Sequence, residues 1–381
     1  MFKIGVIGYG GRIRDMLKEF LRTGEIAVTA VCDTDPAYAR KNADENGVGE
    51  YAFYSDAREM LEKEALDGVL VGTRCSLHTE YACLVASFGI PLFLEKPVAT
   101  TRAQEEQLKS ILFHSDKTVV SFPLRVTDIV LRVKEIVESG RIGKLSQVQA
   151  VNNVPYGRVY FHGWYRDESE TGGLFLQKST HDFDYINSML GEARPVSVSA
   201  VASKVIFKGD KPAGLLCENC PEQDACPESP ERLRALNIDP TGYGCCFARD
   251  TGNHDSGSAL VTYDTGIHVV YTQNFVARNK AAKRGARFIG YDGTVEFDFP
   301  TAQITVYEHH TGKVERIDMS GDFGQHFGGD RRLAEAFLRV LKGERSPSTL
   351  AEGIQSVSMC LAARESAETG RFVPVDFRIE K

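Results

Sequence analysis

The chain has 381 residues, 42% hydrophobic and 25% charged, which is long enough for two domains at the usual ~100 to 200 residues each. A net charge of -7 without any Lys/Arg block argues against a nucleic-acid partner and favours a small metabolite. The sequence opens directly into a strand-like run, and no later segment approaches ~18 uninterrupted apolar residues. We therefore expect a cytoplasmic protein without a membrane partner.

A strand, a glycine turn and a helix follow one another at the start of the chain. Residues 3–7 are β-rich, and apolar residues recur at helical spacing over 13–23. Glycines between them would allow a pyrophosphate to approach the N–H groups at the start of the helix. The third position of the G-x-G-x-x-G pattern is Ile13, so the helix could lie farther from the sheet. The turn residues that we expect to contact a dinucleotide are Gly8, Tyr9, Gly10, Gly11, Arg12 and Ile13.

Asp33 ends the second predicted strand, 25 positions after Gly8. A carboxylate there accepts hydrogen bonds from the adenosine ribose hydroxyls. It would also repel a 2′-phosphate, so NAD is favoured over NADP.

The alternation of strands and helices continues through the first third of the chain. It predicts an α/β domain over residues 1–122 with a doubly wound parallel sheet of six strands. Thr73 and Arg74 would border the nicotinamide ribose, and His78 opens the next helix, where a capping or packing role is equally expected. The predicted helices are 57–64, 78–88 and 101–113, and the later strands are 69–72, 91–94 and 119–122.

Lys96 stands in Glu95-Lys96-Pro97 at the end of the fifth predicted strand. Ligands of parallel sheets collect beyond the carboxyl ends of the strands, so this cation can reach a substrate hydroxyl beside a nicotinamide ring. A solvated lysine at a strand end is the alternative. Glu95 and Lys96 are also assigned to cofactor binding.

A second domain, 123–381, begins with a predicted helix at 129–138 and a strand at 147–154. A helix over 171–184 would place His181 and Asp184 on adjacent turns. Aromatic and polar residues gather before it, as in sites that stack on a sugar and bind its hydroxyls, although a packed aromatic edge is an alternative. The substrate candidates from residues alone are His162, Trp164, Arg166 and Arg278.

Several motifs in this order resemble the Gfo/Idh/MocA oxidoreductases. They are Gly8-Tyr9-Gly10-Gly11, Glu95-Lys96-Pro97, Gly172-Gly173 with His181 and Asp184, Gly290-Tyr291-Asp292-Gly293-Thr294-Val295-Glu296, and Gly328-Gly329-Asp330. The resemblance implies a Rossmann domain, then an α+β domain with a large open, mostly antiparallel sheet. That sheet would form a homodimer or homotetramer, and a final helix, 351–369, would return to the first domain.

The resemblance also implies that Lys96 and His181 flank the reacting carbon, with His181 as the base. The family often has an aspartate four residues before this histidine, where this chain has Gln177. Gln177 is the third catalytic candidate, after Lys96 and His181. It can form hydrogen bonds but carries no charge, so Lys178 is a candidate for an ionic role. Lys178, His181 and Asp184 join the substrate candidates.

Three functions follow from these expectations. The leading one is an NAD-dependent dehydrogenase that moves a hydride between nicotinamide and a secondary hydroxyl of a sugar, glycoside or cyclitol. The alternatives are a redox-type glycosidase that uses NAD without net turnover, and a non-catalytic regulatory protein that binds NAD or sugar.

Five of the nine cysteines lie in an insertion at about 208–253. Three closely spaced thiols and a distal one can surround a tetrahedral ion, which predicts a structural zinc site. Reduced free thiols are the alternative, and an iron–sulfur cluster a lesser one. The candidate metal ligands are Cys217, Cys220, Cys226, Cys245 and Cys246.

Overall fold

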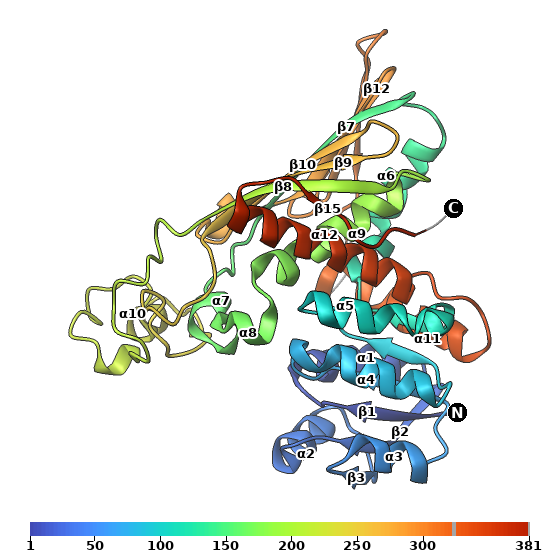
Figure 1. Cartoon of the computed structure of the whole chain (residues 1–381), viewed down its shortest axis with the longest axis vertical. Coiled ribbons are helices and arrows are strands. Elements are labelled where there is room, and N and C mark those ends of the chain that lie inside the picture. The colour runs from blue at the N-terminus through green and yellow to red at the C-terminus, as the bar shows by residue number, and fades with distance from the viewer. Residues whose placement is uncertain (322–324, 380–381) are drawn as a thin grey trace.

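Two β-sheets frame the protein in a computed structural model that describes residues 1–321 and 325–379 (Figure 1). The first has the strand order β3-β2-β1-β4-β5-β6, and every neighbouring pair is parallel. This confirms the predicted six-stranded doubly wound sheet. Its strands are β1 (Phe2–Ile7), β2 (Ile26–Cys32), β3 (Ala52–Tyr54), β4 (Gly68–Val71), β5 (Leu92–Leu94) and β6 (Thr118–Val120).

Helices cover both faces of the first sheet. Ile13 on α1 is fully buried against Gly72, where an added Cβ would lie 2.0 Å from Ile13 Cγ1. A residue without a side chain therefore accommodates the bulky residue that replaces the third glycine of the fingerprint. The helices are α1 (Gly11–Arg22), α2 (Pro36–Glu45), α3 (Ala57–Lys63), α4 (His78–Ser87) and α5 (Arg102–Lys109).

The second sheet is open and has nine strands in the order β14-β13-β12-β11-β7-β10-β9-β8-β15. Among the strand pairs of the described residues, only β7–β10 is parallel in this sheet, so the prediction of a mostly antiparallel sheet is confirmed. Its strands are β7 (Leu145–Asn153), β8 (Pro195–Ser203), β9 (Ser256–Tyr263), β10 (His268–Asn274), β11 (Lys283–Gly290), β12 (Gly293–Asp298), β13 (Gln303–Glu308), β14 (Val314–Asp318) and β15 (Val373–Pro374).

One face of the second sheet is covered by helices, among them α6, α9 and α12 (Figure 1). Strand residues on this face are buried and alternate with more exposed ones, as in β9. The helices of this half are α6 (Asp128–Glu138), α7 (Val159–His162), α8 (Glu168–Thr171), α9 (Thr180–Met189), α10 (Pro230–Ala235), α11 (Gly329–Leu341) and α12 (Leu350–Thr369).

Two late helices join the halves of the molecule. In α12, the Ala351 N–H donates to Ser115 Oγ of the first half (2.9 Å), and Ser366 Oγ accepts from Ala200 N of β8 (2.8 Å). In α11, Phe337 makes edge contacts with Phe20 and Phe93 at ring-centre distances of 5.7 and 5.9 Å. The late helix α11 thus contributes to the hydrophobic core of the N-terminal sheet. The domain limits at 122 and 123 stay a prediction.

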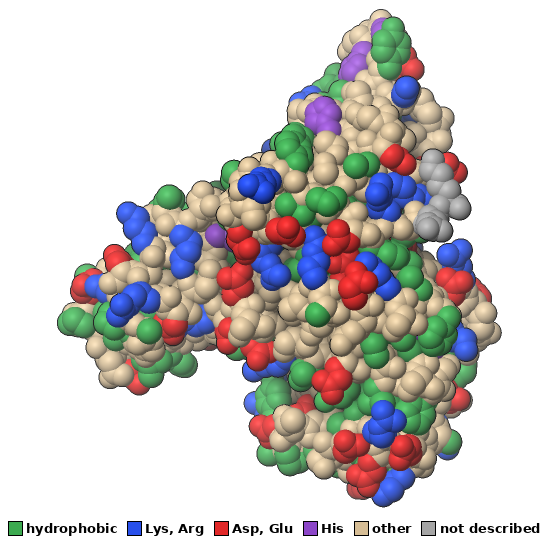
Figure 2. Space-filling view, in the orientation of Figure 1, with side chains coloured by type: hydrophobic (Ala, Val, Ile, Leu, Met, Phe, Trp, Pro, Cys, Tyr) green, Lys and Arg blue, Asp and Glu red, His purple; other side chains and the backbone are tan. Residues whose placement is uncertain are grey.

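The connection between the adjacent strands β8 and β9, residues 204–255, forms a lobe that carries α10 (Figure 1). Acidic and basic side chains are interspersed over the face seen in Figure 2, which shows no large patch of one sign. Within 1–321 and 325–379, no helix combines the length and the apolar composition needed to span a bilayer.

Candidate functional site

The glycine turn between β1 and α1 leaves room for a ligand. Gly8 has φ +78°, and a Cβ there would lie 2.8 Å from the Thr73 backbone, so only glycine fits. A Cβ on Gly11 would meet nothing within 4 Å. Gly10 precedes α1 and no side chain caps the helix, so its first N–H groups are available to an anion. These observations fit a dinucleotide pyrophosphate.

Asp33 lies directly beside this turn. Its carboxylate accepts hydrogen bonds from the backbone N–H groups of Tyr9 (2.7 Å) and Asp35 (2.9 Å). Both bonds fix the carboxylate at the end of β2, next to the space above the glycines. The Tyr9 side chain is buried, and its hydroxyl accepts from Asn46 Nδ2 (3.0 Å).

Arg12 is held within the protein. Its guanidinium donates to Glu95 Oε1 (3.0 Å), to both carboxylate oxygens of Asp330 (2.8 Å each) and to Ser121 Oγ (3.2 Å). His326 Nδ1 lies 2.9 Å from the same Asp330 carboxylate. Arg12 and Glu95 therefore fasten the glycine turn to β5 and to the start of α11.

The residues after β4 have different surroundings. Thr73 lies against Gly8, and the exposed Arg74 guanidinium lies 3.9 Å from the centre of the Trp164 ring. His78 is buried, with Nδ1 2.7 Å from Pro97 O and Nε2 3.2 Å from Thr73 O. Both ring nitrogens of His78 thus contact the backbone, and burial lowers its pKa.

Lys96 follows β5 and precedes a cis peptide bond to Pro97. Its ammonium donates to the backbone carbonyl of Gln177 (3.1 Å), which belongs to the second half of the chain. Burial, and then the positive charge of Lys178, lower the pKa of Lys96 to about 8. The strand end is therefore joined to the segment that leads into α9.

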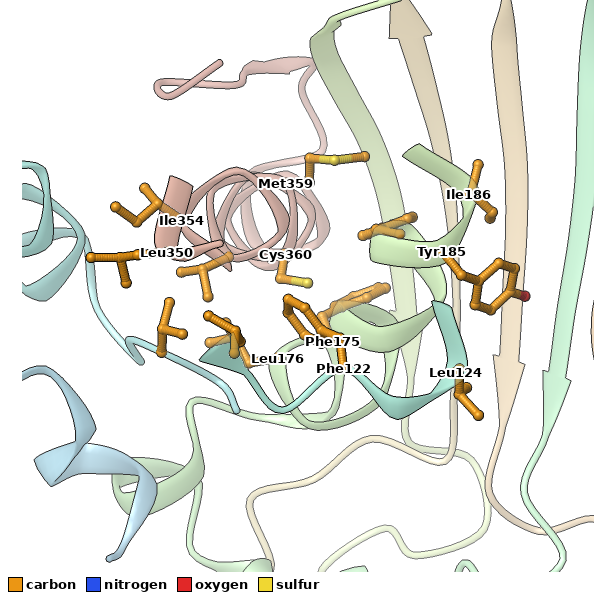
Figure 3. Packing of buried hydrophobic residues seen from close by; sticks show 14 of the residues in the cluster. Phe122, Leu124, Phe175, Leu176, Tyr185, Ile186, Leu350, Ile354, Met359 and Cys360 are labelled. Carbon is orange, nitrogen blue, oxygen red and sulfur yellow. The ribbon is translucent and has the colours of Figure 1, made fainter. Parts of the chain in front are cut away.

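The helix predicted over 171–184 has a different form. Gly172 and Gly173 have φ of +73° and +86°, and residues Phe175–Ser179 form a π-helical turn before α9 begins at Thr180. Phe175 and Leu176 of this turn pack with Phe122 against α12 (Figure 3). π-Turns occur at functional sites because they re-aim side chains.

His181 lies in the first turn of α9 with 6% of its surface exposed. Its ring makes an edge contact with Phe122 at 5.9 Å, and Nδ1 is buried without a hydrogen-bond partner among the described residues. Burial, followed by the positive charge of Lys96, holds the pKa of His181 well below its ordinary value. The imidazole is therefore neutral at neutral pH and can accept a proton.

Gln177 and Asp184 contact other groups. The Gln177 amide donates to Cys75 Sγ (3.2 Å) and to Thr171 O (3.3 Å), so its backbone carbonyl is what reaches Lys96. Asp184 accepts from the Arg125 guanidinium (3.0 Å) in the core.

Lys178 is buried, and its ammonium donates to the Tyr156 hydroxyl (2.7 Å). Burial, followed by the proximity of Arg284, lowers the pKa of Lys178. Lys178 also acts on Lys96 and His181 through its charge. The structure thus brings Lys96, Lys178 and His181 into one neighbourhood.

Comparisons with known proteins agree with this geometry. Residues 2–122 match the profile "Oxidoreductase family, NAD-binding Rossmann fold", and residues 130–296 match the "GFO/IDH/MocA C-terminal domain". The chain belongs to the Gfo/Idh/MocA family. The resemblance expected from the sequence is confirmed.

Relatives of this family member include dehydrogenases. YteT of Bacillus subtilis, assigned as an oxidoreductase, is 28% identical over 85% of this chain and 84% of its own. Myo-inositol 2-dehydrogenase of Thermotoga maritima is 29% identical over 50% of this chain and 55% of its own. A levoglucosan dehydrogenase solved with NADH and levoglucosan has a TM-score of 0.77 at 18% identity, covering 98% of this chain and 99% of its own, which shows a shared fold.

Three predicted substrate residues of this Gfo/Idh/MocA protein bind its β8–β9 connection. His162 Nδ1 lies 2.7 Å from Gly244 O. Arg166 donates to Cys245 O (3.0 Å) and to Asp250 (2.9 Å), and Arg278 Nη2 lies 3.5 Å from a Glu228 carboxylate oxygen. These contacts hold the lobe formed by residues 204–255 against the rest of the second half. Trp164 differs, because it contacts Arg74 of the first half.

The structure gives no support to the predicted zinc site. Cys217, Cys220, Cys226, Cys245 and Cys246 line one cavity of about 290 Å³. However, in residues 1–321 and 325–379 no group of three or more His, Cys, Asp or Glu side chains is placed to hold a metal ion. A zinc site needs its thiolate sulfurs within ~2.3 Å of the ion. Burial raises the pKa of Cys217 to about 11, which favours the thiol.

The sequence did not lead us to predict three residues near Lys96, Lys178 and His181. They are Tyr156, Asp182 and Arg284. Asp182 is fully buried and accepts from Arg284 (2.8 Å), Asn152 (2.8 Å) and Tyr271 (2.9 Å). Tyr156 was not distinguishable from other aromatic residues of its loop. Arg284 pairs with Asn152 across β11 and β7, a register that the sequence alone does not reveal.

Proposed function

We propose that this protein is an NAD(H)-dependent dehydrogenase of a secondary hydroxyl on a sugar, glycoside or cyclitol. The observation that carries the proposal is the bond between Lys96 and the turn before α9, because it brings a cation from a Rossmann strand end to a neutral histidine of the other half. Relatives named as inositol dehydrogenases, and a neighbour solved with NADH and levoglucosan, support the substrate class.

The chain's own residues have distinct roles in this proposal. When bound, NAD supplies the nicotinamide that accepts the hydride. Gly8, Gly10 and Gly11 hold its pyrophosphate, and Asp33 holds the adenosine ribose. Lys96 donates to the substrate oxygen and stabilises the charge that develops there, while neutral His181 accepts the hydroxyl proton.

NAD is favoured over NADP because the fixed Asp33 carboxylate would repel a 2′-phosphate. An Asp33→Ser variant should increase the ratio of kcat/KM with NADP to kcat/KM with NAD by at least about tenfold. Steady-state kinetics with both cofactors measure this ratio. Asp44→Ser, which removes an exposed acid of α2, should leave the ratio unchanged. An unchanged ratio in Asp33→Ser would exclude the ribose role.

The activity should depend on the protonation of Lys96. Because the pKa of Lys96 is lowered to about 8, the ammonium loses its proton as the pH rises through this value and kcat/KM should fall. His181 has a pKa well below its ordinary value, so it is neutral across this range and sets no alkaline limb. A Lys96→Arg variant keeps its charge and should lose the limb, which a pH profile of kcat/KM tests.

A panel of sugars and cyclitols with NAD tests the function itself. We expect nicotinamide absorbance to increase with at least one polyol and chromatography to show its oxidised product. Product formation without net NADH would instead indicate the redox-type glycosidase. NADH binding without turnover of any compound would indicate a regulatory protein.

The uncovered face of the second sheet is our proposed contact surface for a homodimer or homotetramer, and the cytoplasm our proposed location. A shallow hollow of about 490 Å³ on the sheet is lined by Leu260, Thr262, Ile267, Val270 and neighbours. Light scattering of the purified protein tests the assembly, and a monomer at micromolar concentration would exclude it.

A further inference from the structure

The charged side chains that act most strongly on His181 all carry the same, positive sign. The charged groups that act most strongly on its imidazole are all basic side chains: Lys96, Arg284, Lys178 and His326. At the position where the family's aspartate would add a negative charge, Gln177 presents a neutral amide to Cys75 and Thr171. The site therefore has a positive potential.

Two of these cations lack an acidic partner. Among the residues that the structure describes, neither the Lys96 nor the Lys178 ammonium forms an ion pair with a carboxylate. Lys96 donates to a backbone carbonyl, and Lys178 donates to the Tyr156 hydroxyl while lying 4.5 Å from that ring's centre. Lys178 is only 6% exposed, so burial removes its ammonium from most of the bulk solvent.

The nearby acids are already engaged. Asp182 accepts from Arg284 and from Tyr271, and Glu95 accepts from Arg12. Burial raises the pKa of Tyr156, but the positive charge of Lys178 opposes this effect and the pKa is lowered to about 8. Among the described residues, the two ammonium groups therefore have no carboxylate of their own to bind.

A third donor lies in the same neighbourhood. Arg284 Nη2 is buried and has no hydrogen-bond partner, although Nε of the same side chain bonds Asp182. Arg284 of β11 is paired with Asn152 at the end of β7, the strand that leads to Tyr156, whose hydroxyl accepts from Lys178. The positive charge of Arg284 lowers the pKa of both Lys178 and Tyr156. Lysine and arginine N–H groups with a phenol hydroxyl form a donor set suited to a carboxylate.

We infer that the substrate is a sugar acid, such as a uronic or aldonic acid, whose carboxylate is bound by Lys178 and Arg284. This inference rests on the proposed function and specifies its substrate class. The carboxylate takes no part in the reaction. A hydroxyl-bearing carbon loses hydride to NAD⁺, its hydroxyl proton passes to His181 and then to solvent, and a keto acid and NADH result.

Matched pairs of compounds test the inference with the full-length protein and NAD. The pairs are D-galacturonate with D-galactose, D-glucuronate with D-glucose, and D-gluconate with D-glucitol. We expect kcat/KM to be about 10- to 100-fold higher for the acid in at least one pair. Equal or faster turnover of the neutral partners would overturn the inference and leave the dehydrogenase proposal intact. A preference for D-galactose 6-phosphate over D-galacturonate would overturn the carboxylate assignment.

Variants of Lys178 test whether this residue causes the preference for the acid over its neutral partner. Lys178→Met should reduce the acid-to-neutral ratio at least about tenfold, mainly through the KM of the acid, whereas Lys178→Arg should preserve the ratio. Lys63→Met, at an exposed lysine of α3, is the matched control and should not change it. An unchanged ratio in Lys178→Met would overturn the role of Lys178.

A binding measurement separates the two proposals if no compound is turned over. Fluorescence of Trp164, the single tryptophan, reports titration of the NADH complex with D-galacturonate or D-galactose. Tighter binding of the acid supports the inference, and equal or weaker binding overturns it. Failure to bind NADH at all would instead overturn the proposed function.

Discussion

Replacing Lys96 with alanine is expected to lower kcat/KM by about 10²- to 10⁴-fold, the range typical for loss of a catalytic proton donor or charge stabiliser. The Lys96 ammonium is the cation that joins the end of β5 to the turn before His181. Without it, neither the substrate oxygen nor the charge that develops on it is stabilised. Kinetics on a verified substrate measure the loss.

The matched control is Lys63→Ala, which removes an exposed lysine whose ammonium bonds Glu59. This variant should retain full activity. NADH affinity of Lys96→Ala, followed by fluorescence titration, should stay within a few-fold of the unmodified protein, because the glycine turn and Asp33 are intact. Unchanged turnover in Lys96→Ala would refute the catalytic assignment.

Replacing Asp182 with asparagine is expected to lower the free energy of unfolding by about 3 to 5 kcal/mol. The carboxylate is fully buried and accepts hydrogen bonds from Arg284, Asn152 and Tyr271. The variant keeps the shape of the side chain but leaves the Arg284 guanidinium buried without a counter-ion. Chemical denaturation of the full chain measures the change.

Asp44→Asn provides the comparison for Asp182→Asn. Asp44 pairs with Arg40 on the exposed side of α2, and more than half of its side-chain surface is accessible. Surface pairs of this kind contribute at most about 1 kcal/mol, so its unfolding should shift little. Equal effects of the two substitutions would show that the Asp182 network does not stabilise the fold.

Local patterns predicted the first half well. The glycines after β1 and the acid at the end of β2 can each be recognised from a few neighbouring residues. The structure places them side by side. Lys96 could also be predicted to lie at a strand end, because the apolar run before it fixes that position. Its partner could not, since the bond reaches 81 residues along the chain to Gln177.

The second half was harder to predict because its contacts are long-range. His162 and Arg166 have side chains suited to a sugar, but their partners lie 82 and 79 residues away in the β8–β9 connection. A helix was predicted over 171–184, and the chain is helical from Leu174 onward, but the prediction did not include the π turn or the two left-handed glycines. The cysteine spacing suggested a metal, whereas the described part of the chain has no group of three or more His, Cys, Asp or Glu side chains placed to hold one.

The dependence of the N-terminal sheet on α11 affects how the protein can be dissected. A fragment that ended at residue 122 would lose the carboxylate of Asp330 and would leave the guanidinium of Arg12 with Glu95 and the Ser121 hydroxyl. It would also expose to water the aromatic edge where Phe337 meets Phe20 and Phe93. We therefore expect the N-terminal half to be less stable without α11, and truncation studies should retain the distal helices or supply them as a separate peptide.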